Sequence, residues 1–340
     1  MFIKGDELMR TAIIGCGNIA QVHAKALNSI KDIDIVAFAD CKQEKAQIMS
    51  EKYTDGAAAV FEDYKEMLDS VSTDVVHICT PHYLHVPMAI EALKRDISVF
   101  MEKPPAISIA EFDKLKDVCK KSSGKIGFCF QNRYNPTTKA IDSIIDNHEM
   151  GNIIGARAFV TWRRDAGYYS DEWHGSLEKE GGGVLINQSI HTLDLLLRYM
   201  GRPVHIAASM SNHHLRNIIE VEDTFEAWME FEKGQRAVLY ATTAYSEDAT
   251  IIMELSFENG RVMMIDKMIY VYPNGKETKM INCEFDMQNC FGKSYWGNGH
   301  LACIKDFYDC IIQGKKYQND IDGVSNTLYT TIRLYEEAEK

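Results

Sequence analysis

Hydrophobic positions in the first 130 residues fall into short continuous runs separated by amphipathic stretches. The runs are TAIIG, IDIVAFAD, DVVHICT, ISVFMEK and KIGFCF, and stretches such as HAKALNSI and MAIEALKRD lie between them. A continuous β-branched run is typical of a strand buried on both faces, and a helical pattern between two such runs indicates a crossover helix. Residues 1–130 are therefore predicted to form a doubly wound parallel sheet of the α/β class.

After residue 130 the pattern changes to alternation of apolar and polar positions. The stretches HIAASMS, TFEAWMEFE, RAVLYATTAY and TIIMELSFE alternate in this way, and Glu-Asn-Gly and Pro-Asn-Gly turns punctuate them. Such turns indicate hairpins. Helical patterns occur at 184–200, 299–314 and 322–338. We predict that residues 131–340 form an α+β domain with a large, mostly antiparallel open sheet whose one face is covered by helices.

Composition narrows the function classes. The chain has 340 residues, of which 46% are hydrophobic and 25% charged, as in a folded globular protein, and its net charge of -12 argues against nucleic acid as a partner. No apolar run is long enough for a membrane span, and the leader MFIKGDEL, residues 1–8, is charged where a signal peptide is apolar. Nine cysteines without a C-x-x-C pair indicate reduced thiols. A cytoplasmic enzyme is expected, with the leader outside the fold.

A glycine fingerprint follows the first predicted strand. Gly15-Cys16-Gly17-Asn18-Ile19-Ala20 has the form G-x-G-x-x-[GA] and opens a predicted helix. In a dinucleotide site Gly15 allows the tight turn, Gly17 lets backbone amides approach the pyrophosphate, and Ala20 permits close helix packing. The alternative is an ordinary strand-to-helix turn. The fingerprint predicts that residues 1–130 are an NAD-binding Rossmann domain.

Asp40 stands at the end of the second predicted strand, 20 positions after Ala20. A carboxylate there accepts hydrogen bonds from the adenosine ribose and repels a 2′-phosphate. NAD is therefore favoured over NADP, although Lys42 lies close enough to weaken that preference.

Two places supply groups that could exchange a proton with an alcohol. Glu102-Lys103-Pro104 ends the run ISVFMEK, at the carboxyl edge of the predicted sheet, where Pro104 restrains Lys103 to an extended backbone. The second place is the segment that begins with Gly181-Gly182-Gly183. If its helix includes positions 187, 191 and 194, then Asn187, His191 and Asp194 share one face.

Several motifs, in order, resemble the Gfo/Idh/MocA oxidoreductases of sugars, inositols and related polyols. The resemblance covers nearly the whole chain, and it rests on the following segments: the fingerprint 15–20, Thr80-Pro81-His82-Tyr83-Leu84-His85, Glu102-Lys103-Pro104, Gln131-Asn132-Arg133-Tyr134-Asn135-Pro136, the glycine-rich stretch through His191 and Asp194, and Gly299-His300 leading into Asp306-Phe307.

The resemblance implies a site in which Lys103 and His191 lie beside the nicotinamide and the reacting carbinol. Residues implied to contact the cofactor are Gly15, Gly17, Asn18, Ile19, Ala20, Asp40, Thr80, Pro81, His85, Glu102 and Lys103. The family often has Asp where this chain has Asn187, and an amide cannot take a proton. Lys103 is therefore expected to be the main acid/base, with His191 orienting the hydroxyl. His82 and His174 also depart from the usual family residues, which affects substrate identity more than catalysis.

A substrate loop is implied by the aromatic residues before the glycine run. Aromatic faces suit the apolar face of a pyranose, and a polar rim suits its hydroxyls. The alternative is that the aromatics pack a domain interface. Residues expected to bind substrate are Asn132, Arg133, Arg163, Tyr168, Trp173, Asn187 and His191, with Tyr169 beside them.

Metal binding is not expected. His82 with His85, His213 with His214, and His191 with Asp194 each lack further ligands at typical spacing. His82 and His85 are instead assigned to the loop after a strand, near the nicotinamide, and His213 and His214 to an exposed turn.

Three function classes follow from the resemblance. The leading one is an NAD(H)-dependent oxidoreductase that transfers a hydride to or from a secondary hydroxyl of a sugar, glycoside or inositol. The second is an enzyme that retains NAD and cleaves glycosides by transient C3 oxidation and elimination. The third is a non-catalytic cofactor-binding sensor, which would be expected to lose the lysine that this chain keeps at Lys103. A homodimer or homotetramer is expected, because the open sheet of the family commonly pairs across its uncovered face.

Overall fold

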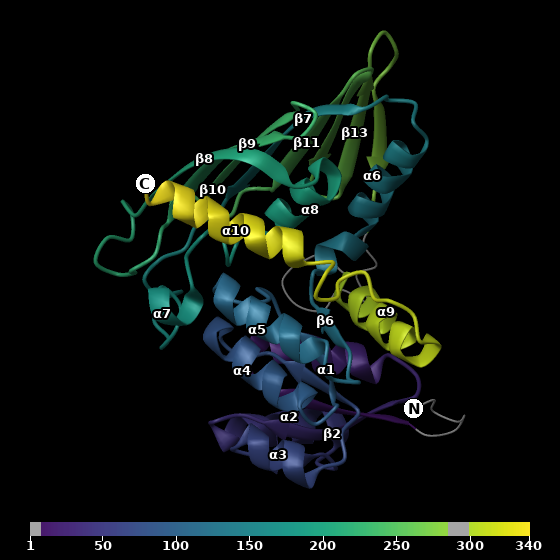
Figure 1. Ribbon diagram of the computed structural model, residues 1–340, viewed down its shortest axis with the longest axis vertical. Coiled ribbons are helices and arrows are strands. Elements are labelled where there is room, and N and C mark those ends of the chain that lie inside the picture. Colours follow the sequence, from purple (N-terminus) through teal and green to yellow (C-terminus); the bar gives the residue numbers. More distant parts are fainter. Residues whose placement is uncertain (1–7, 285–298) are drawn as a thin grey trace. The chain divides into compact units, whose positions relative to one another are not determined.

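The computed structural model describes residues 8–284 and 299–340, and the chain divides into two compact units (Figure 1). The described residues of the first unit are 8–131 and 299–324, and those of the second are 132–284 and 325–340. Residues 1–7 of the expected leader, and Cys290, lie outside the described residues. Among the described residues, no helix combines the length and the apolar character that crossing a membrane requires.

The first unit contains a six-stranded parallel sheet in the order β3-β2-β1-β4-β5-β6. Its strands are β1 (Met9–Ile14), β2 (Ile33–Ala39), β3 (Ala59–Phe61), β4 (Val75–Ile78), β5 (Ser98–Met101) and β6 (Ile126–Phe128). The helices are α1 (Asn18–Asn28), α2 (Gln43–Thr54), α3 (Tyr64–Ser70), α4 (His82–Leu93) and α5 (Ile109–Cys119). This order is that of a Rossmann fold, and it confirms the predicted doubly wound sheet. The prediction missed β3, a three-residue strand at the edge.

The strand order reverses between β1 and β4, which lie side by side although three helices and two strands separate them in the chain. Parallel sheets bind ligands outside the carboxyl ends of their strands at such a switch point. The glycine fingerprint follows β1, and Thr80 follows β4. The fold therefore brings two of the predicted cofactor segments to one edge of the sheet.

One late helix also belongs to the first unit. Helix α9 (Gly299–Gln313) packs against α1, and Tyr308 on α9 is hydrogen-bonded to Thr11 of β1 at 2.8 Å between the hydroxyl oxygens. The sequence analysis placed this helical pattern in the second domain. Its buried face, which includes Phe307 and Tyr308, instead completes the core of the first unit.

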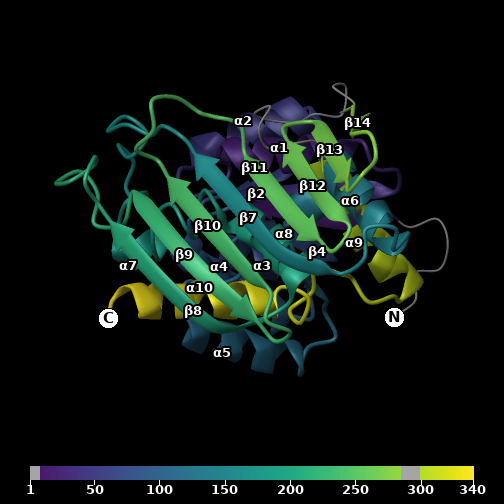
Figure 2. The same ribbon diagram turned by 90° about the horizontal axis from the view of Figure 1, so that it is seen from above.

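The second unit contains an eight-stranded mixed sheet in the order β14-β13-β12-β11-β7-β10-β9-β8 (Figure 2). The strands are β7 (Ile153–Thr161), β8 (Pro203–Ser211), β9 (Thr224–Phe231), β10 (Arg236–Thr242), β11 (Ile252–Phe257), β12 (Gly260–Ile265), β13 (Met268–Pro273) and β14 (Lys279–Asn282). Only β7 and β10 pair in parallel among these described strands, so the sheet is mostly antiparallel, as predicted.

Helices cover one face of this sheet. The α-helices of the second unit are α6 (Pro136–Asp146), α7 (Leu177–Glu180), α8 (Ile190–Met200) and α10 (Ser325–Ala338), and a short 3-10 helix, η1, spans Gln131–Tyr134. Helix α10 packs on β8, α8 on β7 and α6 on β13. In Figure 2 the strands lie in front of α8 and α10.

The other face of the sheet is more exposed. Along β9 and β10, Phe225, Ala227 and Met229 are buried in alternation with more exposed residues, and Trp228 is paired with Val238, which is 42% exposed. The alternation of the sequence thus corresponds to one face packed on helices and one open face.

Candidate active site

The glycine loop between β1 and α1 is shaped by backbone contacts. Gly15 has φ +85°, and a Cβ at this position would lie 2.7 Å from the carbonyl oxygen of Cys79, at the end of β4. A side chain is therefore excluded from Gly15 both by its backbone conformation and by its neighbour. At Gly17, by contrast, a Cβ would have no heavy atom within 4 Å. The loop is packed on one side and open on the other.

The N-terminus of α1 is available to an anion. Gly17 is its N-cap, and among the described residues no side chain caps the helix and no acidic residue lies in its first turn. The first amides of a helix carry partial positive charge and suit a phosphate. Burial raises the pKa of the neighbouring Cys16 thiol to about 12, so Cys16 adds no negative charge. Ala20 is fully buried and allows close packing. These residues fit a dinucleotide.

The Asp40 carboxylate is oriented by the glycine loop itself. Its Oδ2 accepts a hydrogen bond from the backbone N–H of Cys16 at 2.8 Å, and its Oδ1 accepts one from Lys42 at 2.9 Å. Each carboxylate oxygen keeps capacity for a further bond. Because Asp40 is only partly buried, it remains able to bond a ribose hydroxyl beside the loop.

The Glu-Lys-Pro motif follows β5 directly, at the same carboxyl edge of the sheet. Glu102 is buried, whereas Lys103 is partly exposed. The ring of His85 lies between two carbonyl oxygens, with Nδ1 2.9 Å from that of Pro104 and Nε2 2.9 Å from that of Thr80. His85 therefore ties the segment after β4 to the motif. The sequence analysis assigned His82 and His85 to a loop, but both lie in the first turn of α4.

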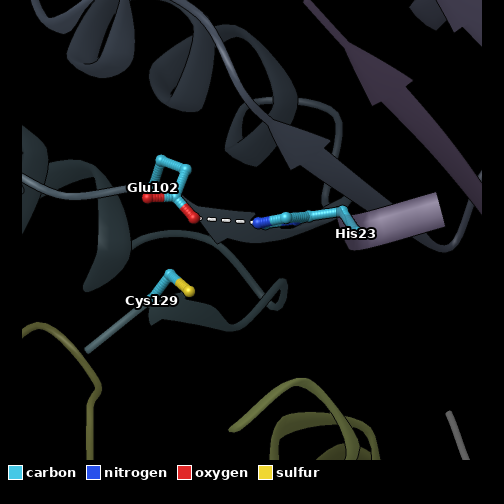
Figure 3. A group of neighbouring side chains, drawn as sticks. All are labelled: His23, Glu102 and Cys129. Carbon is cyan, nitrogen blue, oxygen red and sulfur yellow. Dashed lines mark hydrogen bonds and ion pairs between the residues drawn. The ribbon is translucent and has the colours of Figure 1, made fainter. Parts of the chain in front are cut away.

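A buried cluster around Glu102 was not predicted (Figure 3). The Nε2 of His23 lies 2.9 Å from Oε1 of Glu102, and Cys129 lies beside them. The three residues each have one atom that could bind a metal, and these atoms lie within 4.8 Å of one another. Burial alone would raise the pKa of Glu102, but the hydrogen bond to His23 and the nearby charges of His300 and Lys103 hold it well below its usual value. Burial raises the pKa of the Cys129 thiol well above its usual value.

This cluster is a hydrogen-bonded network. Two of its three possible ligand atoms are already bonded to each other, and the described residues offer no fourth, whereas zinc sites usually have four. No signal in the sequence could have found it, because His23 and Glu102 are 79 residues apart.

His191 belongs to the second unit and is the second residue of α8. The predicted helix began at residue 184, but α8 begins at Ile190, so Asn187 precedes it and does not share its face with His191 and Asp194. The amide of Asn187 instead donates to Glu180 Oε1 at 2.5 Å. The glycine run causes this difference, since Gly181 and Gly182 have positive φ angles that a helix does not accept.

Arg133 and Asp194 form a buried ion pair. The guanidinium donates two hydrogen bonds to the carboxylate, Nε to Oδ2 at 2.7 Å and Nη2 to Oδ1 at 2.5 Å, and the side chains are 7% and 1% exposed. Thr327 of α10 adds a third bond to Asp194 at 2.6 Å. This pair holds η1 to α8 and α10. Neighbouring Asn132 is partly exposed, and its backbone carbonyl accepts from Thr138.

The aromatic residues before the glycine run pack against one another. The rings of Trp173 and His174 are 3.7 Å apart between centroids, and Tyr168 lies 4.8 Å from His174. Tyr168 also packs beside a buried cluster of Tyr169, Leu215, Ile219 and Val221. Tyr168 and Trp173 are themselves only partly buried.

The two arginines at the start of this loop differ in burial. Arg163, expected in the substrate rim, is exposed, and its backbone N–H bonds Asp248. Arg164 is buried, pairs with Asp248 at 2.7 Å, and lies over the rings of Trp162 and Tyr168. No sequence signal distinguishes these two adjacent arginines.

The chain belongs to the Gfo/Idh/MocA family. Residues 9–129 match the oxidoreductase family with an NAD-binding Rossmann fold, and residues 138–263 match the GFO/IDH/MocA C-terminal domain. This match confirms the resemblance seen in the motifs, and it establishes an oxidoreductase with an NAD-binding Rossmann domain.

Individual relatives are distant. The chain is 28% identical to D-glucoside 3-dehydrogenase of Escherichia coli over 90% of this chain and 88% of that protein. It is 26% identical to scyllo-inositol 2-dehydrogenase (NAD(+)) of Bacillus subtilis over 94% and 92%. The structure of the WlbA dehydrogenase from Bordetella pertussis, in complex with NADH and UDP-GlcNAcA, superposes with a TM-score of 0.86 at 23% identity, covering 98% of this chain and 96% of that one. This last similarity shows the shared fold.

Proposed function

We propose that the protein is an NAD(H)-dependent oxidoreductase that transfers a hydride between the nicotinamide and a secondary hydroxyl of a sugar, glycoside or inositol. The observation that carries this proposal is the partly exposed Lys103 beside buried Glu102, at the carboxyl edge of a sheet whose glycine loop fits a dinucleotide. The relatives named for D-glucoside, myo-inositol and scyllo-inositol oxidation support the substrate class.

The cofactor is proposed to be NAD rather than NADP. The amides after Gly15 and Gly17 would hold the pyrophosphate, Asp40 would accept from the ribose, and Thr80, Pro81 and His85 would lie near the nicotinamide. When bound, the nicotinamide supplies the hydride acceptor or donor. Asp40 opposes a 2′-phosphate by charge. We expect kcat/KM with NAD to exceed that with NADP, and a preference for NADP would contradict the role of Asp40.

Lys103 is proposed as the main acid/base and His191 as the group that orients the hydroxyl and assists. Lys103 belongs to the first unit and His191 to the second. Lys103→Met should lower kcat about a hundredfold to ten-thousandfold, the usual scale for general acid/base catalysis, while NADH still binds. His191→Ala should lower kcat less.

The test uses a panel of sugars, glycosides and inositols with NAD, followed at the NADH absorbance. Lys114→Met, a change at an exposed lysine of the same unit, is the matched control and should turn over like the wild type. If Lys103→Met kept most of its turnover on a proven substrate with its fold intact, Lys103 would not be the acid/base. Glycoside cleavage without net NADH, with cofactor tightly held, would instead support the glycoside-cleaving alternative.

Tyr168 and Trp173 are proposed to contact substrate. Both rings are partly exposed at the margin of the aromatic cluster, which leaves faces for a sugar ring. We expect Trp173→Ala to raise the KM for the sugar several-fold and to leave the Kd for NADH unchanged. An unchanged KM together with a lower melting temperature would assign Trp173 to packing alone.

A homo-oligomer is proposed through the open face of the eight-stranded sheet. Trp228 and the 42% exposed Val238 lie paired on that face, and Val238 is next to the exposed Arg157 of β7. Exposed apolar area of this kind is typical of interfaces. Light scattering should give a mass of two or four chains, and Val238→Glu should lower it.

A further inference from the structure

A continuous chain of hydrogen bonds runs through the core of the first unit and ends at Glu102. Thr11 bonds the hydroxyl of Tyr308 at 2.8 Å, and this hydroxyl lies 2.9 Å from Nε2 of His77. The Nδ1 atoms of His77 and His23 are 2.8 Å apart, and His23 Nε2 reaches Glu102 at 2.9 Å. All five side chains that take part in this series of hydrogen bonds are buried. The residues come from β1, α9, β4, α1 and the end of β5.

Three proton arrangements satisfy every bond of this hydrogen-bond chain, and two of them leave Glu102 without a proton. In the first, both histidines are neutral and every donor points toward Glu102: Thr11 to Tyr308, Tyr308 to His77, His77 to His23 and His23 to Glu102. In the second, His23 carries one more proton and donates to both His77 and Glu102, so that the bonds of His77 and Tyr308 reverse. Burial and the neighbouring His23 hold the pKa of His77 well below its usual value, so the extra proton does not reside on His77.

Glu102 accepts the bond from His23 in these two arrangements, and the low pKa of its carboxyl keeps it ionised in both. The third arrangement, with the proton on Glu102, is opposed by the His23 bond and by the neighbouring Lys103, which lower the pKa of this carboxyl despite its burial. A buried carboxylate is costly unless such bonds compensate it. The series of hydrogen bonds thus maintains the negative charge of Glu102 in the core, next to Lys103.

The titratable groups that face Glu102 come from every surrounding element. They are His23 of α1, His77 and Cys79 at the end of β4, His85 of α4, Cys129 after β6, His300 of α9 and Lys103 itself. Burial raises the pKa values of the two thiols and lowers those of His77, His85 and His300, the last to about 4. The remaining groups that face the carboxylate are His23, which bonds it, and Lys103.

We propose that His23, His77 and Tyr308 are positioning residues that hold Glu102 as a buried anion beside Lys103, and that this anion sets how readily Lys103 exchanges its proton. A fixed negative charge favours the ammonium form of an adjacent lysine. The backbone N–H of Lys103 also bonds Glu102 Oε2 at 3.3 Å, so the carboxylate contacts the lysine's own peptide unit. The consequence for turnover rests on the proposed function, but the effect on the lysine does not.

The first test changes the anion. Competitive acetylation of the full-length protein with acetic anhydride, followed by peptide mass spectrometry across pH, measures how much of Lys103 is in the amine form. Because Glu102→Gln removes the charge and nearly keeps the shape, Lys103 should be acetylated about tenfold faster than in the wild type at neutral pH, a shift of one unit in the midpoint. A profile that superimposes on that of the wild type would overturn the proposal.

The second test changes the far end of the chain. Tyr308→Phe removes the hydroxyl that bonds His77, and it should shift the acetylation profile of Lys103 in the same direction by a smaller amount. Tyr53→Phe is the control, since Tyr53 belongs to the same unit and its hydroxyl bonds Gln21, a contact that does not lead to Glu102. If both variants gave the same profile, the positioning role of Tyr308 would be refuted. This pair also decides the matter if Glu102→Gln fails to fold.

Kinetics then connects the two proposals. On a substrate that the wild type oxidises, Glu102→Gln should move the acidic limb of the pH profile of kcat/KM to lower pH. A protein that oxidises nothing in the panel but shows the acetylation shift would contradict the proposed function and leave this inference standing. Oxidation of a substrate by a protein that shows no acetylation shift would support the proposed function and contradict this inference.

Discussion

The two glycine-rich segments of the molecule use the same residue for opposite purposes. In the first unit, a Cβ added at Gly17 would meet no heavy atom within 4 Å. In the second unit, a Cβ at Gly182 would lie 2.2 Å from the hydroxyl of Tyr335, and one at Gly183 would lie 2.0 Å from the carbonyl oxygen of Glu222. The first segment keeps space for a ligand, whereas the second has its space filled by the protein.

Hydrogen bonding distinguishes the two segments as well. The amides of Gly183 and Leu185 donate to the buried carboxylate of Glu222 at 2.8 and 3.0 Å, and Tyr335 donates to the same group at 2.8 Å. The first turn of α1 has no such side-chain acceptor among the described residues. A glycine run is therefore suited to a cofactor where, as in the first turn of α1, no side chain of the protein caps the helix amides that follow it.

The largest expected effect is that of Gly183→Ala. Its methyl group would overlap a backbone carbonyl, which cannot move aside as a flexible side chain can, so the free energy of unfolding should fall by about 3 kcal/mol. Urea denaturation measures this loss. The protein that remains folded should bind NADH with unchanged affinity, and weakened NADH binding would mean that the second segment also serves the cofactor.

Gly17→Ala should show the converse, with a smaller effect. Its methyl group enters the open side of the loop and separates the amides from the pyrophosphate, so NADH should bind about tenfold more weakly, which corresponds to about 1.4 kcal/mol. Fluorescence titration of NADH measures this change. The free energy of unfolding should change by less than about 1 kcal/mol, the scale of an N-cap substitution. If Gly17→Ala lost much of its stability but bound NADH normally, Gly17 and Gly183 would not differ in the proposed way.

The smallest expected effect concerns the pH dependence of stability at Glu222. Burial raises the pKa of Glu222, although the bonds from Leu185, Tyr335 and Gly183 oppose the shift. A folded-state pKa above the unfolded value means that the native state binds the proton more tightly, so this group lowers stability as pH rises from about 4.5 through the folded value. Glu222→Gln removes that loss.

Denaturation of both proteins at several pH values tests this expectation. The free energy of unfolding of Glu222→Gln should increase relative to that of the wild type from pH 4.5 to pH 7.5, so that the variant becomes relatively more stable. A difference that is constant across this range would show that Glu222 does not titrate with folding.

The sequence predicted the elements whose signal is local. Continuous apolar runs predicted β1, β2, β4, β5 and β6, and alternation predicted the antiparallel sheet of the second unit. The fingerprint predicted the loop at 15–20 and the position of Asp40 because both depend on spacing within one βαβ segment. Three-residue β3 has too few positions to show any periodicity.

The contacts that the sequence did not predict are non-local. The pair of Arg133 with Asp194 joins residues 61 positions apart, and that of Tyr308 with His77 joins residues 231 apart. Asn187 was assigned to a helix because its spacing from His191 is helical, but the preceding glycines delay the start of α8 to Ile190. Spacing is informative only after the start of a helix is known.

The return of the chain to the first unit has a consequence for synthesis on the ribosome. Most of the parallel sheet is complete once Phe128 has been made, yet α9, which carries Tyr308 and ends at Gln313, is translated 185 residues later. At about 5–20 residues per second this delay is about 10–40 s. During that interval the nascent Rossmann sheet lacks part of its core and the last link to His77. An expression fragment that ends near residue 131 would therefore carry the glycine loop but an unfinished interior.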